Sequence, residues 1–145
     1  MNSWVCVDAN IVLKLVLQEA DSDKAYCLWN TWLDQRYRPV APYLFPIELA
    51  SVLRKHVYRG VISAAYGRDA LDSALAFNVT LLTFSSLSQC AWQLAEKLNR
   101  PTAYDAHYLA LAELLHCDFW TADRRLYNVA ATLSWVHSLD EIPEG

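Results

Sequence analysis

Apolar residues along this chain fall into short uninterrupted runs that alternate with longer segments in which apolar positions recur at helical spacing. The short runs predict buried strands at residues 4–7, 40–41, 79–84, 119–121 and near Val136. The longer segments predict helices at residues 11–17, 22–37, 46–59, 63–76, 86–98 and 104–115. Because strands that alternate with amphipathic helices are typical of a parallel sheet covered on both faces, we predict an α/β fold, a three-layer α/β/α sandwich with a central, mainly parallel sheet.

Capping residues and prolines set the expected ends of several helices. Asp21-Ser22 offers an N-cap for the second predicted helix, and Pro39 is expected to end it. Pro46 stands near the first turn of the third predicted helix, which Gly60 is suited to terminate. No linker, repeat or low-complexity stretch interrupts this order, so we expect a single domain spanning residues 1–145.

Composition indicates a compact protein with a large core. Hydrophobic residues make up 54% of the chain and charged residues 19%, which excludes intrinsic disorder and favours oligomerisation through leftover apolar surface. The four cysteines lie far apart in apolar stretches without a C-x-x-C pair, and we interpret them as reduced core residues. The beginning of the chain lacks a basic start and a long apolar run, so we expect no signal peptide, no membrane span and a cytoplasmic location.

The overall charge restricts the possible functions. A net charge of -4 and a pI near 5.5 argue against a general nucleic-acid binder, which carries a basic excess. A nuclease with a small basic patch beside an acidic metal site is still compatible with these values, because the patch and not the total charge steers a substrate. The chain has no G-x-x-x-x-G-K-[ST] loop and no G-x-S-x-G motif, which argues against nucleoside triphosphate binding and serine-hydrolase chemistry.

Four acidic residues stand alone at the edges of apolar segments: Asp8, Glu48, Asp105 and Asp123. Two of them follow predicted strands and two lie in the first turn of a predicted helix, so all four can converge where the strand order of the sheet reverses. Each acid taken singly is better explained as a helix cap. Four carboxylates together would repel one another unless cations neutralised them, and oxygen-only ligands suit Mg²⁺ or Mn²⁺.

Basic residues accompany two of these acids. Lys55 and Arg59 follow Glu48 by seven and eleven residues, within about 20° of it around a helix. Arg124 and Arg125 come directly after the last of the four acids. These four basic residues are candidates for holding substrate phosphates, with an ordinary solvated surface as the alternative. Since divalent ions polarise phosphate and lower the pKa of bound water, the pattern indicates phosphodiester hydrolysis.

Four short motifs, in their order and spacing, resemble the PIN-domain family, and within it the VapC-type toxin ribonucleases of prokaryotic toxin-antitoxin pairs. The motifs are Val7-Asp8-Ala9-Asn10, Pro46-Ile47-Glu48-Leu49-Ala50-Ser51-Val52-Leu53-Arg54, Tyr104-Asp105-Ala106 and Thr121-Ala122-Asp123-Arg124-Arg125-Leu126. The similarity runs from about residue 4 to residue 139. This resemblance implies an α/β/α fold, homodimerisation, Mg²⁺- or Mn²⁺-dependent endoribonuclease activity and inhibition by a small antitoxin peptide.

The resemblance also implies roles for single residues. Asp8, Glu48, Asp105 and Asp123 match the acidic metal-site residues of the family. Asn10 matches a small polar position near the metal, where Ser or Thr is more usual, and Thr121 matches a polar residue that orients the last acid or a bound water. Asp8 and Asp105 are the expected direct ligands, Glu48 a ligand or a base for water, and Asp123 a ligand or a more remote anchor.

Two hypotheses for function follow. The first is an endoribonuclease that hydrolyses RNA phosphodiester bonds with Mg²⁺ or Mn²⁺ and acts as the toxin of a type II toxin-antitoxin pair. The second is a catalytically silent PIN-like binding module, in which the same acidic pocket receives an arginine-bearing partner peptide.

Overall fold

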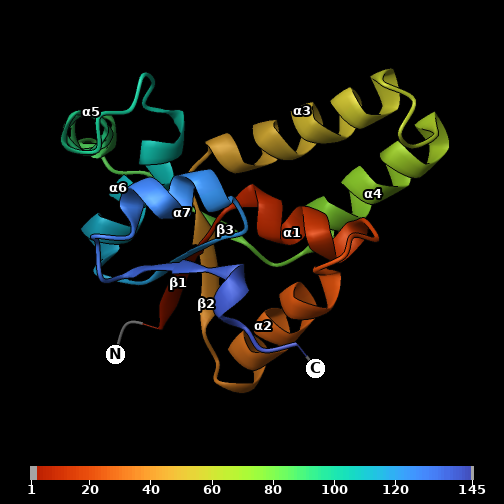
Figure 1. Ribbon diagram of the computed structural model, residues 1–145, viewed down its shortest axis with the longest axis horizontal. Helices are drawn as coiled ribbons and strands as arrows, with labels where there is room; N and C mark the ends of the chain where they lie inside the picture. Colours follow the sequence, from red (N-terminus) through yellow and green to blue (C-terminus); the bar gives the residue numbers. More distant parts are fainter. Residues whose placement is uncertain (1–2, 145) are drawn as a thin grey trace.

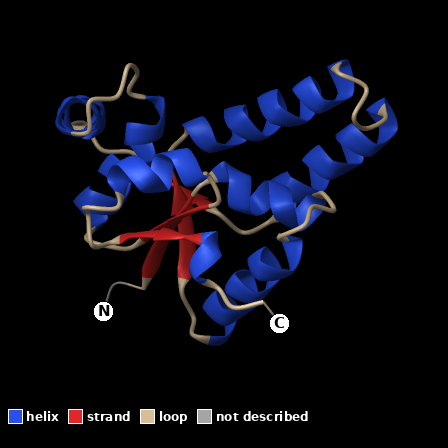
Figure 2. Cartoon of the chain, in the orientation of Figure 1, coloured by secondary structure: helices blue, strands red, loops and turns tan. Residues whose placement is uncertain are grey.

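The computed structural model describes residues 3–144 and contains a five-stranded sheet flanked by helices (Figure 1 and Figure 2). The strands are β1 (Trp4–Val7), β2 (Arg38–Ala41), β3 (Thr80–Leu81), β4 (Phe119–Thr121) and β5 (Val136–Ser138). The helices are α1 (Ala9–Val16), α2 (Ser22–Asp34), α3 (Leu44–Tyr58), α4 (Ala64–Ala76), α5 (Leu87–Lys97), α6 (Tyr104–Leu115) and α7 (Arg124–Ala130), with a short 3-10 helix η1 (Leu139–Glu141). This arrangement confirms the predicted α/β/α class.

All neighbouring strands in the sheet are parallel, in the order β3-β2-β1-β4-β5. The chain passes from β1 to β2 and β3 on one side, then returns to β4 and β5 on the other, so the order reverses between β1 and β4. Cys6 pairs with Phe119 and Val7 with Trp120, and the Asp8 N–H donates to the Trp120 carbonyl oxygen at 3.0 Å. Asp8 therefore leaves β1 at the reversal point, where α/β proteins bind ligands.

Helix α6 holds the centre of the molecule together because it packs against both β1 and β4. Its central residues are almost entirely buried: Ala106, Tyr108, Leu109, Ala110, Leu111 and Ala112. Helix α3 buries Leu49 and Leu53 in the same core. These contacts fix the beginnings of α3 and α6 beside the carboxyl ends of the two central strands.

Helices α3 and α4 form an antiparallel pair that projects from the sheet toward the upper right of Figure 1. The turn between them contains Gly60, whose φ of 75° lies in the left-handed region. Ser63 begins α4 as its N-cap and accepts a hydrogen bond from the Tyr66 N–H at 3.1 Å. The predicted termination of α3 at Gly60 and the predicted start of α4 are both confirmed.

Several predicted boundaries are wrong. Helix α2 ends at Asp34, three residues earlier than predicted, and the chain turns at Arg36 with a φ of 61°. Pro39 lies inside β2 instead of ending a helix. The Arg38 N–H donates to the Ser3 carbonyl oxygen on the side of β1, so the nitrogen of the next residue, Pro39, faces the side of β3. Because β3 pairs only with Val40 and Ala41, no hydrogen bond is lost at Pro39.

Two further predictions differ from the structure, and one helix was not predicted. The strand predicted at 79–84 is reduced to the two residues of β3. Helix α7 was not predicted, because its seven residues are too few to show a clear helical period. Cys27, interpreted as a core residue, is exposed, since Leu28 and Trp29 take the buried positions of α2.

Within residues 3–144, no helix is long and apolar enough to span a membrane.

Candidate metal and catalytic site

Asp8 is the most deeply buried of the four acids, with 6% of its surface exposed. It is the N-cap of α1, but its side chain makes no cap hydrogen bond, although the Asn10 N–H approaches it. The Thr121 hydroxyl instead donates to Asp8 Oδ2 at 2.9 Å. Capping therefore does not account for a carboxylate at this buried position.

Thr121 ties the carboxyl end of β4 to that of β1. Its fully buried hydroxyl also accepts hydrogen bonds from the Asp123 N–H at 3.0 Å and from the Asn10 side-chain amide at 3.3 Å. The Asn10 side-chain oxygen accepts from the Ala122 N–H at 2.9 Å. The two predicted polar residues thus fix the direction of Asp8 and the course of the backbone that leads to Asp123.

The carboxylates of Asp8, Glu48 and Asp105 lie close enough to repel one another. Burial raises the pKa of Asp8 to about 7, the charge of Glu48 adds to the rise, and the Thr121 hydroxyl opposes it ahead of a smaller contribution from Asp105. Burial also raises the pKa of Glu48, and the charge of Asp105 again adds to the rise. Three acids, one directly after β1, one in α3 and one in α6, therefore lie close to one another.

Asp105 connects this group to the fourth acid. It lies in the first turn of α6, and its pKa is raised by burial and by the charge of Asp123. Arg100 opposes that rise, with its Nη2 atom 3.7 Å from Asp105 Oδ2. Arg100 was missed in the sequence, because it stands in the loop before α6 and only the fold brings it back to Asp105.

Asp123 does have the capping role that the sequence allowed for each acid. It is the N-cap of α7, and its Oδ1 atom accepts from the Arg125 N–H at 2.9 Å and the Leu126 N–H at 3.2 Å. Both bonds use the same oxygen. Asp123 is thus held rigidly at the rim of the site, next to Asp105.

Glu48 is the only one of the four acids with a buried oxygen that lacks a partner within residues 3–144. Its Oε1 atom is one of two such buried side-chain atoms there, and the other is the hydroxyl of Tyr108. Tyr108 was also missed in the sequence, although its position three residues after Asp105 places it on the same side of α6.

The donors at this site suit a hard divalent cation. Among the described residues, no group of three or more His, Cys, Asp or Glu side chains is already drawn together closely enough to hold a metal ion. The donors are nevertheless all oxygen atoms, their charges repel one another, and one carboxylate oxygen is buried without a partner. A bound Mg²⁺ or Mn²⁺ would reduce the repulsion between the carboxylates and give the unpaired Glu48 oxygen a partner.

The predicted basic residues on α3 lie farther out along the helix than Glu48. Lys55 and Arg59 are exposed and share an open surface with Arg54 and Tyr58. Glu48 is partly buried, so the side of α3 that carries Glu48, Lys55 and Arg59 is exposed to solvent at the two cations but not at the acid. At about 1.5 Å per residue, Lys55 lies roughly 10 Å from Glu48 along the helix axis.

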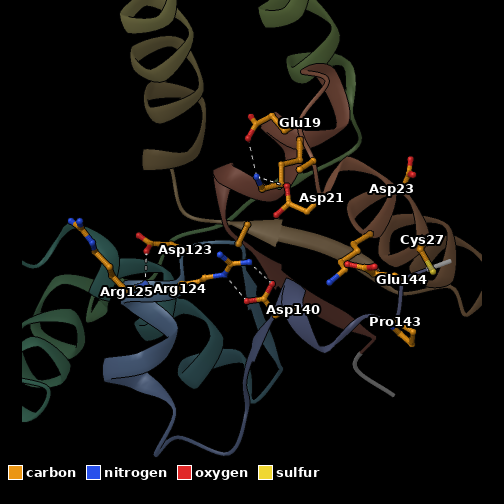
Figure 3. Close-up of a pocket in the computed structure, with 14 residues that line it drawn as sticks. Glu19, Asp21, Asp23, Cys27, Asp123, Arg124, Arg125, Asp140, Pro143 and Glu144 are labelled. Atoms are coloured by element: carbon orange, nitrogen blue, oxygen red, sulfur yellow. Dashed lines mark hydrogen bonds and ion pairs between the residues drawn. The ribbon is translucent and has the colours of Figure 1, made fainter.

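A cavity of about 960 Å³ opens beside Asp123 (Figure 3). Lys14 lines it and is paired with Asp21 at 2.7 Å. Arg124 also lines it and donates to Asp140 at 2.8 and 3.2 Å, whereas Arg125 points away from that pair. Arg124 is therefore already engaged, and of the two arginines Arg125 is the more available to a substrate.

Comparisons with known proteins agree on one family. The PIN domain family matches residues 5–132. A VapC ribonuclease of Mycobacterium bovis and ribonuclease VapC9 of Mycobacterium tuberculosis are each 34% identical to the chain over 122 residues, which cover 84% of this chain and 87% of theirs.

Two solved structures have a similar fold. The crystal structure of PAE2754 from Pyrobaculum aerophilum superposes with a TM-score of 0.70 at 20% identity, covering 97% of this chain and 93% of the other. A toxin-antitoxin complex from Klebsiella pneumoniae superposes with a TM-score of 0.59 at 16% identity, covering 91% and 94%.

Proposed function

Because the chain belongs to the PIN domain family, we propose that it is a metal-dependent endoribonuclease that hydrolyses RNA phosphodiester bonds, the toxin of a type II toxin-antitoxin pair. The observation that carries this proposal is the buried Asp8 carboxylate, whose pKa is raised to about 7 by burial and by the neighbouring Glu48. Relatives at 34% identity are named ribonucleases, and this supports RNA as the substrate.

The four acids have different proposed roles at the site. Asp8 and Asp105 would hold Mg²⁺ or Mn²⁺ directly, Glu48 would act as a further ligand or as a base for water, and Asp123 would act as a ligand or as a more remote anchor. When bound, such an ion polarises the scissile phosphate and lowers the pKa of a bound water. Thr121 keeps the Asp8 carboxylate in one orientation by donating to its Oδ2 atom.

RNA would reach this site along exposed cations. Lys55 and Arg59 on α3 and Arg125 at the start of α7 are the proposed phosphate contacts. Arg124 would have to exchange its bond to Asp140 for a phosphate, so its contribution is expected to be smaller.

We also propose two protein partners, a small antitoxin and a second copy of the chain. The antitoxin follows from the resemblance to VapC-type toxins. The second copy is supported by large apolar side chains that the structure leaves exposed on α3, α5 and α6, including Ile47 at 61%, Trp92 at 65% and Tyr104 at 66%. Light scattering of the purified chain tests the dimer.

Cleavage of RNA by the purified chain, with Mn²⁺ or Mg²⁺ and with EDTA as the blank, tests the proposed activity. Asp8→Asn and Asp105→Asn are expected to lower the cleavage rate at least about 100-fold. Asp72→Asn, which changes an exposed acid on α4, is the matched control and should leave the rate unchanged. If the site variants cleave as well as the wild type, the assignment is wrong. A silent binding module predicts no cleavage with either ion.

A further inference from the structure

Tyr108 carries a buried hydroxyl group that the packing of the core does not explain. The residue is 1% exposed, and within residues 3–144 its hydroxyl has no hydrogen-bond partner. Buried polar groups are nearly always paired, because a hydroxyl that loses water without gaining a partner destabilises the fold. Phenylalanine would fill the same space without this penalty, so the oxygen atom calls for another role.

The surroundings of Tyr108 fix the direction of its side chain. Its ring packs against Phe119 of β4 with 6.0 Å between the ring centroids. Its backbone carbonyl accepts a hydrogen bond from the Cys6 thiol of β1 at 3.5 Å. These two contacts anchor Tyr108 beneath the carboxyl ends of the two central strands, on the helix that also carries Asp105.

The hydroxyl end of Tyr108 lies beside the acids of the site. The carboxylates of Asp8 and Glu48 both lie within electrostatic range of this hydroxyl, which is a hydrogen-bond donor. The same hydroxyl opposes the burial-driven rise in the pKa of Glu48. The two groups are thus close neighbours, although the contact falls short of a formed hydrogen bond.

Glu48 differs from the other three acids in how it is held. A threonine hydroxyl fixes Asp8, two backbone amides fix Asp123, and an arginine lies against Asp105. Glu48 has the longest side chain of the four, and its buried Oε1 atom has no partner among the described residues. The nearby Tyr108 hydroxyl has the chemistry to complete the set.

We propose that Tyr108 is a positioning residue for Glu48, to which its hydroxyl donates a hydrogen bond when the site is loaded. Donation to Oε1 would leave the other carboxylate oxygen free to face the cation or the attacking water. It would also satisfy both of the unpartnered buried atoms with a single bond. This inference rests on the proposed function, because the orientation of Glu48 matters only if the site performs chemistry.

Tyr108→Phe tests this role, with Tyr26→Phe as the matched control. The Tyr26 hydroxyl donates to the Leu15 carbonyl oxygen at 2.6 Å, away from the acids, so its loss should lower stability without changing cleavage. Tyr108→Phe should keep or raise the melting temperature without metal. Its kcat should fall about tenfold with an unchanged KM for RNA, and the Mn²⁺ concentration for half-maximal thermal stabilisation should rise about tenfold.

A second pair of variants shows whether Tyr108 acts through Glu48. In a Glu48→Ala background, Tyr108→Phe should change neither the Mn²⁺ midpoint nor the residual kcat any further. A further loss of the same size would overturn the inference. So would a Tyr108→Phe variant that matches a wild type with metal-dependent cleavage. If the wild type itself shows neither cleavage nor stabilisation by Mn²⁺, both the proposed function and the inference about Tyr108 are wrong.

Discussion

The buried carboxylate of Asp8 makes the stability of the metal-free protein depend on pH. Its pKa in the folded protein is about 7, mainly because of burial and then because of Glu48, while the ordinary pKa of an aspartate is 3.8. Between these two values the folded state holds a proton that the unfolded state releases. The free energy of unfolding should therefore fall as pH rises from about 4 to about 7.

Asp8→Asn should remove most of this pH dependence, because asparagine places no charge beside Glu48 and Asp105. In EDTA, denaturant unfolding at pH 5 and pH 7.5 should show a clear loss of stability for the wild type and a smaller loss for the variant. The remaining slope comes from Glu48 and Asp105, whose raised pKa values act in the same direction. Identical slopes for both proteins would contradict the burial of a charged Asp8.

Thr121 offers a separate test of how Asp8 is oriented. Thr121→Val keeps the shape of the side chain but removes the hydroxyl that bonds Asp8, Asp123 and Asn10. We expect a loss of about 1–3 kcal/mol in stability and about 10- to 100-fold in cleavage rate. Thr121→Ser keeps the hydroxyl and should cleave at nearly the wild-type rate. Equal activity of the two variants would show that the hydroxyl does not matter.

The four acids could be found in the sequence, because each one interrupts or ends an apolar segment. Their individual environments could not. Whether Asp8 or Asp123 caps its helix depends on side-chain geometry, and the Thr121 hydroxyl that holds Asp8 comes from 113 residues away in the chain. Arg100 was missed for the same reason, since its contact with Asp105 exists only once the loop before α6 folds back.

Among the secondary-structure elements, α3 and α4 pack so closely that one position tolerates no side chain. A Cβ atom at Gly67 would lie 2.5 Å from Val57 Cγ2. Gly67→Ala should therefore lose about 1–3 kcal/mol through overpacking, although alanine favours a helix by about 1 kcal/mol. In a Val57→Ala background the same change should be neutral or stabilising, which denaturant unfolding can measure. A destabilisation of equal size in both backgrounds would place its cause elsewhere.

Activity per folded molecule should survive Gly67→Ala, because Val57 and Glu48 lie about two and a half turns apart on α3. The first part of α3 buries Leu49 in the core and fixes Glu48, whereas the last part meets α4. A loss of RNA cleavage without unfolding would show that the helix pair transmits its packing to the site.

Long amphipathic helices and apolar strands could be predicted because their pattern repeats over several turns or fills the core. Short elements contain too few residues to show a hydrophobic period. For this reason α7 was not predicted, and β3 is much shorter than the apolar segment that contains it. The prediction that Pro39 ends a helix was wrong for a different reason. The place of Pro39 inside β2 depends on where the neighbouring strand begins. Strand pairing is a tertiary property that the local sequence does not contain.

Across the whole molecule, the distribution of charge should matter more for RNA binding than the net charge of -4. The acids gather beyond the carboxyl ends of the strands, and Lys55 and Arg59 extend from that edge along the exposed face of α3. Arg36 is equally exposed but lies just before β2, at the amino ends of the strands. Arg36 and Lys55 thus carry the same charge but lie on opposite sides of the sheet, one at the amino ends of the strands and one beyond their carboxyl ends.

Lys55→Glu and Arg36→Glu change the net charge by the same amount, so a comparison of the two isolates the effect of position. Lys55→Glu should raise the KM for RNA several-fold at low salt and leave kcat unchanged, since Lys55 lies about 10 Å from Glu48 along α3. The difference should shrink as salt is added, because fewer counterions are released on binding. Arg36→Glu should scarcely change KM. Equal increases for both variants would mean that total charge, and not a path along α3, governs how RNA approaches the acids.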